Sequence, residues 1–291
     1  NSGGNGEMSN FNYGVGVENG GEITADVSGN VMVTGNGTPM STAASYNCGV
    51  YVNGMGAKIT SNGGKVTVTG TGVGVSASSG NIGVSVKGGG EITSGGSGAV
   101  EVTGNGSKDA NGININNHGV NINGSKITSG GNGTVTVKGN SGGNGETSSL
   151  NHGVYLETGG EISAGVDGNV IVTGNGASVS TATSNNYGVY VNGVGAKITS
   201  NGGSVTVTGT GVGTSSENRG VSVEGGGQIT SGDNGAVEVI GNGSANATGN
   251  SNIGVYIVST GSKITSGGNG TVTVKGNSGG KGAMSSDNYG V

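Results

Sequence analysis

Residues that could perform acid–base or metal chemistry are few in this sequence, and their spacing does not gather them. The chain of 291 residues has two histidines, one cysteine and one arginine. A site that cleaves polysaccharides needs several acids, or acids with Arg or Lys, that converge in one groove. The five aspartates instead fall at unrelated points: Asp26, Asp109, Asp167, Asp233 and Asp287. The sequence therefore predicts a protein that is not an enzyme and that uses no cofactor and no metal.

Asparagine supplies the most regular polar pattern. The tetrapeptide Asn-x-Gly-Val occurs nine times, at intervals of 32 to 36 residues. If the repeats stack in register, the side-chain amides hydrogen-bond from each repeat to the next. We expect the glycine of the motif to supply a positive φ or a close approach of the backbone. The predicted structural asparagine ladder consists of Asn12, Asn47, Asn81, Asn117, Asn151, Asn186, Asn218, Asn252 and Asn288.

Charged residues alternate in sign at a second position of the repeat, just before an isoleucine. If one repeat forms one coil, these side chains stack about 4.8 Å apart, where like charges repel and opposite charges attract. The alternation therefore favours one coil per repeat over two shorter coils per repeat. The predicted charge ladder consists of Glu22, Lys58, Glu91, Lys126, Glu161, Lys197, Gln228 and Lys263.

Tyrosines recur directly after the Gly-Val pair, and we expect them to point outward from the first strand of each repeat. Aromatic residues make up only 3% of the chain, so their gathering on one strand suggests a contact surface. Cross-strand packing alone is the alternative explanation. The candidate contact residues are Tyr51, Tyr155, Tyr190 and Tyr256.

The second position of Asn-x-Gly-Val holds His118 and His152 in neighbouring repeats. Stacking would bring them within reach of one metal ion, but two ligands make a weak site. The same position elsewhere holds tyrosine, isoleucine, cysteine and arginine. We therefore interpret it as a variable strand edge.

Three short segments in each repeat must position these side chains. In the second repeat they are residues 49–52, 58–60 and 65–70, in which Val and Ile alternate with polar residues. This period of two indicates half-buried strands, and the Gly-Gly, Asn-Gly and Ser-Gly pairs between them indicate turns. The sequence predicts an all-β parallel β-helix, a β-solenoid with about 35 residues and three short strands per coil, and eight coils plus a partial ninth.

Composition excludes several other classes of protein. The chain has 72 glycines and one proline, which argue against a helical protein and against collagen. A net charge of −5 argues against nucleic-acid binding, and no apolar run is long enough to span a membrane. Disorder is the remaining alternative, and the regular placement of the apolar residues argues against it.

A longer period is superimposed on the repeat. Residues 1–139 and 140–276 align nearly throughout, and a third copy begins at 277. We therefore expect residues 1–291 to form one continuous β-solenoid, which we interpret as a window of a longer array. A solenoid of this kind would have itself as a partner, through end-to-end stacking or continuation of the chain into a fibre.

The repeats resemble those of large bacterial surface proteins. The segments 186–191, 196–200 and 203–209 are similar to the glycine-rich repeats of filamentous-haemagglutinin-like and autotransporter-type adhesins. The resemblance implies a right-handed β-helix, an extracellular or cell-surface location in bacteria, and cell-surface glycans or other cells as partners. The expected function is a stiff structural shaft or filament, serving adhesion or a cell-surface matrix. A carbohydrate-binding or carbohydrate-processing β-helix is the alternative.

Overall fold

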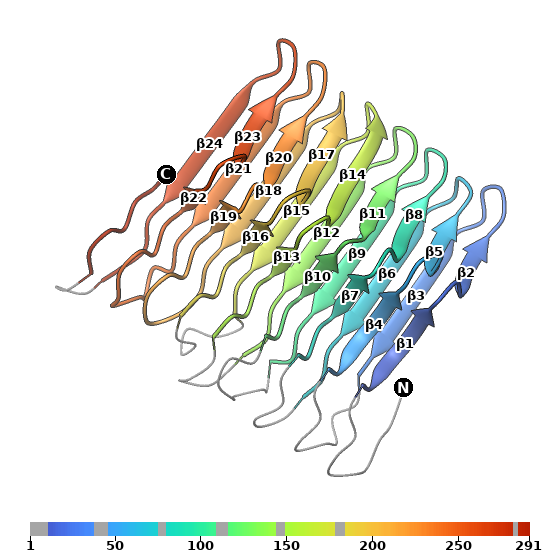
Figure 1. The fold of residues 1–291 in the computed structure, drawn as a ribbon, viewed down its shortest axis with the longest axis horizontal. Helices are drawn as coiled ribbons and strands as arrows, with labels where there is room; N and C mark the ends of the chain where they lie inside the picture. Colours follow the sequence, from blue (N-terminus) through green and yellow to red (C-terminus); the bar gives the residue numbers. More distant parts are fainter. Residues whose placement is uncertain are drawn as a thin grey trace.

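The computed structural model describes residues 11–37, 46–74, 80–108, 116–143, 149–177, 184–281 and 285–291. These ranges contain 24 strands and no helix, so the prediction of an all-β protein is confirmed. The strands form three parallel sheets of eight strands each, and every coil contributes one strand to each sheet (Figure 1).

The strands follow one another in the same order in every coil. The first sheet contains β1 (Tyr13–Glu18), β4 (Cys48–Asn53), β7 (Val84–Lys87), β10 (Val120–Asn123), β13 (Val154–Leu156), β16 (Val189–Asn192), β19 (Val221–Glu224) and β22 (Val255–Ile257). The second sheet contains β2 (Glu22–Ala25), β5 (Lys58–Ser61), β8 (Glu91–Ser94), β11 (Lys126–Ser129), β14 (Glu161–Val166), β17 (Lys197–Asn201), β20 (Gln228–Ser231) and β23 (Lys263–Ser266). The third sheet contains β3 (Val31–Asn36), β6 (Val66–Thr71), β9 (Val100–Asn105), β12 (Val135–Asn140), β15 (Val170–Asn175), β18 (Val205–Thr210), β21 (Val237–Asn242) and β24 (Val272–Asn277).

The register shows that one sequence repeat forms one coil. Val120 pairs with Val154, and Lys126 pairs with Glu161, so strand partners lie one whole repeat apart. The eight strands of each sheet mark eight coils, so the chain completes about seven turns from the first strand of a sheet to the last, and the alternative of two coils per repeat is wrong. After β24 the chain continues the pattern, because the main-chain N–H of Val255 donates to the carbonyl of Gly290.

The interior of the solenoid is lined by aliphatic side chains from all three sheets. Val50, Val52, Ile59, Val66 and Val68 are all fully buried, which confirms the predicted inward positions. Val predominates on the inner face of the first and third sheets, with Ile122 and Leu156 also buried in the first, and Ile predominates on that of the second. Each such side chain stabilises the fold by about 1.5–3 kcal/mol, and neighbouring coils share the buried surface.

Glycines form the corner where the third sheet meets the first. A side chain on Gly49 would collide with the backbone at Gly70 and Thr71, and neither Gly49 nor Gly70 has a positive φ. Of the two roles expected for this glycine, the structure therefore shows the close approach. The positive φ lies instead at the residue before each ladder asparagine: Phe11, Tyr46, Gly80, Asn116, Leu150, Asn185, Glu217, Ser251 and Asp287.

Candidate functional site

The asparagines of Asn-x-Gly-Val stand in one column at the start of the first sheet. The amide Nδ2 of Asn12 donates to Oδ1 of Asn47 at 2.9 Å, and Asn47 donates to Asn81 at 2.8 Å. From Asn81 onward the main-chain N–H also donates to Oδ1 of the next asparagine, at 2.7–3.2 Å. Each Oδ1 therefore links two coils, and the column connects successive coils along the axis of the solenoid.

Replacing Asn151 with Ala is expected to lower the unfolding free energy by about 2–3 kcal/mol. The change removes the acceptor for the buried main-chain N–H of Asn117 and the amide donor to Asn186. Chemical denaturation measures the effect, with the exposed Asn132→Ala as the control. Equal stabilities of the two variants would show that the ladder contributes nothing measurable.

The alternating charges also occupy one column, on the outer face of the second sheet. The register places Glu91 beside Lys58 on one side and Lys126 on the other. Lys58 lies 3.6 Å from Glu91, while Glu161 lies 3.4 Å from Lys197 and 4.0 Å from Lys126. Glu22 pairs in register with Lys58, and the neutral Gln228 stands between Lys197 and Lys263. The side chains are partly exposed, so each pair contributes little.

Reversing the charge at Lys126 is expected to destabilise the stack by up to about 1 kcal/mol. The Lys126→Glu substitution would place three carboxylates in a row with Glu91 and Glu161. Lys138→Glu is the matched control, because its neighbours on the third sheet are Thr103 and Thr173. A melting temperature at low salt that falls equally in both variants would remove the energetic basis of the charge ladder.

The predicted contact tyrosines lie on the outer face of the first sheet, but they do not form one continuous row. Tyr155 and Tyr190 stack with ring centroids 5.0 Å apart, as direct neighbours on β13 and β16. Ser85 and Asn121 separate Tyr51 from Tyr155, and Ser222 separates Tyr190 from Tyr256. The tyrosines therefore form two separate aromatic groups, one at Tyr51 and one at Tyr155 and Tyr190, with a gap of two coils between them. A single ring at Tyr256 follows the second group.

A second stacked column, which sequence reasoning interpreted only as a variable edge, runs beside the tyrosines. His118 stacks on His152 at 5.1 Å, and His152 stacks on Tyr187 at 4.9 Å. Arg219 continues the column, with its guanidinium 5.3 Å from the ring centroid of Tyr187, and it also lies 4.0 Å from the ring centroid of Tyr256 on the strand. Of these side chains, His118 lines one wall of the groove described below. The sequence indicates this column only through the second position of Asn-x-Gly-Val, which all of its members occupy.

Burial controls the protonation of the two histidines. It lowers the pKa of His118 to about 3, and the charge of Lys87 acts in the same direction. Burial and then His118 lower the pKa of His152 well below its usual value. The main-chain N–H of His152 donates to Nδ1 of His118 at 3.3 Å, so the proton of the neutral ring lies on Nε2. Both rings are therefore uncharged at neutral pH.

Arg219 is the charged member of this column and is held by acids on both sides. Its guanidinium lies 2.7 Å from Glu224 and 3.3 Å from Glu217, and it also donates to Ser222. The side chain is only 8% exposed, so the pair with Glu224 compensates for the loss of hydration.

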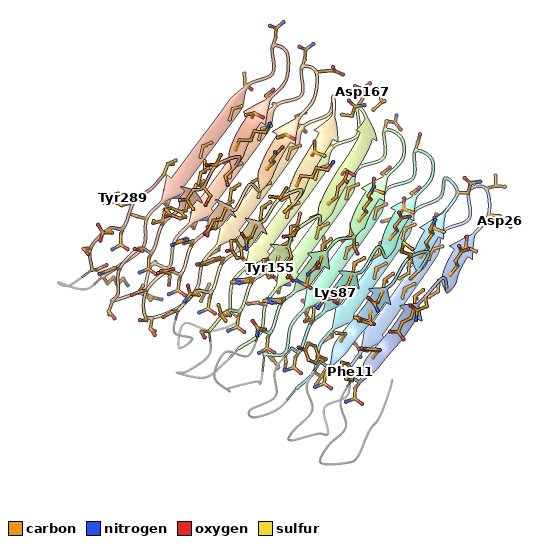
Figure 2. All side chains as sticks on the ribbon, viewed as in Figure 1. Phe11, Asp26, Lys87, Tyr155, Asp167 and Tyr289 are labelled. Carbon is orange, nitrogen blue, oxygen red and sulfur yellow. The ribbon has the colours of Figure 1, made fainter. Side chains whose placement is uncertain are left out.

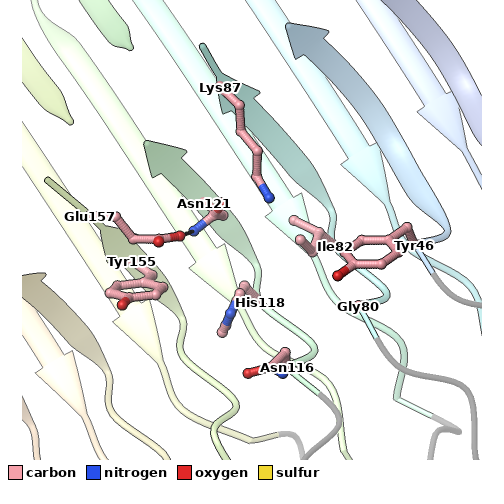
Figure 3. Close-up of a pocket in the computed structure, with 9 residues that line it drawn as sticks. All are labelled: Tyr46, Gly80, Ile82, Lys87, Asn116, His118, Asn121, Tyr155 and Glu157. Atoms are coloured by element: carbon pink, nitrogen blue, oxygen red, sulfur yellow. Dashed lines mark hydrogen bonds between the residues drawn. The ribbon is translucent and has the colours of Figure 1, made fainter. Parts of the chain in front are cut away.

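The groove opens into a pocket of about 320 Å³ between the two aromatic groups (Figure 3). Its polar and aromatic lining consists of Tyr46, Lys87, Asn116, His118, Asn121, Tyr155 and Glu157. Lys87 and Tyr155 lie near the middle of the stack, whereas Asp26 and Asp167 lie at the turns after the second sheet (Figure 2). The arrangement brings together one cation, one carboxylate, an amide and an aromatic face, which is a set of groups for binding a polar molecule.

Buried serines form a further ladder that was not predicted. Ser200 Oγ donates to the carbonyl of Gly168 at 2.6 Å, and Ser231 and Ser266 repeat this contact with Gly203 and Gly235. The recurring Ile-Thr-Ser tripeptide was the available signal. This ladder satisfies carbonyls at the corner between the second and third sheets, so its role is structural.

No protein-family model, curated protein or solved structure matches the chain. Within the described ranges, His, Cys, Asp and Glu do not gather in groups of three or more that could hold a metal ion. That same part of the chain has no helix with the length and apolar character needed to cross a membrane.

Proposed function

We propose that the chain forms a stiff extracellular β-helical shaft or filament on a bacterial surface, serving adhesion or a cell-surface matrix. The support from the sequence is the resemblance of segments such as 186–191 and 203–209 to filamentous-haemagglutinin-like and autotransporter-type adhesins. Repeats of one length and one register suit a shaft, because each added coil pairs with the last one by the same contacts.

The observation that carries this proposal is the regular stacking of the coils, in which the three sheets and the asparagine column run along the same axis. The three sheets keep their register through eight strands, apart from one irregularity at Ala164 and Val166 between β14 and β17, and the asparagine column joins coil to coil along the same axis. Bending the solenoid would stretch main-chain and side-chain hydrogen bonds on one side simultaneously. A rod with this construction resists bending without a thick cross-section.

Electron microscopy of the native material, combined with antibody labelling of intact cells, tests the proposal. We expect unbranched fibres on the cell exterior, with an axial spacing near 4.8 Å in diffraction from aligned fibres. Self-association through stacked ends or one long polypeptide would both give this result. A compact particle inside the cell would contradict the proposal.

Carbohydrate binding is a second candidate function, favoured by the aromatic groove of the first sheet. Tyr155 and Tyr190 present a pair of stacked, half-buried rings beside Glu157 and Asn192. Aromatic faces with neighbouring amides and carboxylates suit the apolar faces and hydroxyl groups of sugars. Titration with oligosaccharides, followed by tyrosine fluorescence, tests this function, and saturable binding that Tyr155→Ser weakens is the expected result.

A further inference from the structure

We propose that the pocket between β7 and β13 binds an acidic pyranose, such as a single uronic acid residue. This proposal rests on the second candidate function, carbohydrate binding, and does not depend on fibre formation. Four features carry it: the open space in the groove, the unpartnered polar atoms, the charges at its two ends, and a filled equivalent in another coil.

The pocket exists because small side chains interrupt the aromatic columns. On the outer face, Tyr51 and Tyr155 flank Ser85 and Asn121, which occupy the equivalent positions on β7 and β10. Farther along, Tyr190 fills this position with an aromatic ring. The large aromatic rings are therefore absent from this position over two coils, and the pocket lies beside this interruption. Its volume of about 320 Å³ is at the small end of ligand pockets and suits one sugar unit.

Two buried polar atoms in this gap have no hydrogen-bond partner among the described residues. They are Oγ of Ser85 and Oδ1 of Asn121, and the two side chains are 0% and 1% exposed. An unsatisfied buried polar atom costs about 1–3 kcal/mol, so folded proteins rarely keep one without a purpose. Of the two residues, only Asn121 lines the pocket (Figure 3), and its unsatisfied oxygen is buried in the pocket wall.

The charges at the pocket determine the kind of ligand. Glu157 accepts the amide hydrogens of Asn121 at 2.7 Å and Asn123 at 2.9 Å, so its carboxylate is already stabilised and suits neutral hydroxyl donors. Lys87 reaches toward the pocket from the other side and makes no ion pair with any described residue (Figure 3). An anionic group on the ligand would complete this end.

The seventh coil shows the same groove with its polar positions occupied. There the guanidinium of Arg219 stacks on Tyr256 and bonds to Ser222 and Glu224. Ser222 corresponds to Asn121 in the register of the first sheet, and Arg219 corresponds to His118 at the second position of Asn-x-Gly-Val. At the pocket His118 lines the space without filling it, so a ligand can occupy it.

Calorimetric titration with sodium glucuronate, methyl glucoside and sodium acetate tests the proposal. We expect saturable binding of glucuronate about tenfold tighter than that of methyl glucoside, because a charged hydrogen bond to Lys87 contributes that much. Acetate should bind more weakly than either sugar, because it lacks the hydroxyls and the face that stacks on Tyr155. Binding of acetate as tight as that of glucuronate would reduce the site to a simple counter-ion contact and overturn the proposal.

Three variants locate the binding. Lys87→Met should remove the preference for glucuronate over methyl glucoside, while Lys138→Met on the third sheet should keep it. Ser85→Tyr should abolish binding of both sugars, because a tyrosine fills this position in the neighbouring coil at Tyr51. If Ser85→Tyr does not fold, Asn121→Ser provides the second test and should weaken glucuronate binding about fivefold, because it removes the amide that holds the carboxylate of Glu157 in place.

Retention of the preference in Lys87→Met, or unchanged binding in the folded Ser85→Tyr and Asn121→Ser variants, would overturn the proposed pocket. Microscopy of the same samples separates this result from the proposed shaft. Fibres without glucuronate binding would contradict only the pocket, and glucuronate binding by compact particles would contradict only the shaft.

Discussion

Acidification from pH 7 to pH 5 is expected to lower the unfolding free energy by about 2 kcal/mol through His118 alone. Burial lowers the pKa of this histidine to about 3, whereas in the unfolded chain it is about 6.5. Between these values the unfolded chain binds a proton that the folded chain does not. Stability is therefore complete above about pH 6.5 and falls as the pH decreases toward 3.

His152 adds to this loss in the same direction, because burial and the neighbouring His118 also lower its pKa. The two rings stack in adjacent coils, so protonation of one makes protonation of the other still less favourable in the folded state. The groups that face them belong to the groove wall and include Lys87 and Tyr155. The acid sensitivity should therefore be concentrated in coils four and five.

Urea denaturation at a series of pH values measures the effect. The double variant His118→Ile and His152→Tyr is the control, since Ile82 and Tyr187 occupy the same column in adjacent coils. We expect the stability of this variant to change far less between pH 7 and pH 5. Parallel stability curves for the two proteins would show that the histidines are not neutral and buried in the folded state.

The fold follows from the sequence because its determinants are local and repeated. Alternation of Val and Ile with polar residues sets the inner face, and the interval between successive Asn-x-Gly-Val motifs sets the length of a coil. Parallel pairing then places Lys126 beside Glu161, and Tyr155 beside Tyr190, without further information. The neighbour of a residue in the next coil can be found by counting one repeat along the sequence.

The groove and its pocket do not follow from counting. Alternation places Ser85 and Asn121 on the outer face, yet both are almost fully buried. They are buried because side chains at the second position of Asn-x-Gly-Val, such as His118, turn over the strand at the corner. At this corner the residue before each asparagine has a positive φ, as at Asn116. Only one of those residues is a glycine, so the sequence gives little sign of this conformation.

Substituting Gly139 with Ala is expected to lower the unfolding free energy by at least about 3 kcal/mol. A methyl group at this position would collide with the carbonyl of Gly153 and press on the side chain of Val154. Relief would require the third sheet to move away from the first, but each of these strands is hydrogen-bonded to the coils before and after it. The backbone therefore has little freedom to make room for one carbon atom.

Hydrogen–deuterium exchange and thermal melting together measure this effect. We expect protection to fall in β12 and β13 and the melting transition to broaden or split, because coils on either side of the lesion become less coupled. Gly16→Ala is the matched control: its added carbon would lie 3.5 Å from the Tyr13 ring, an ordinary contact, and its φ is not positive.

If both variants have the melting temperature of the unmodified protein, the corner where the third sheet meets the first tolerates a side chain. The repeated glycine would then reflect composition and not a packing requirement. A loss confined to Gly139→Ala would instead explain why glycine recurs at both positions of this corner in every coil.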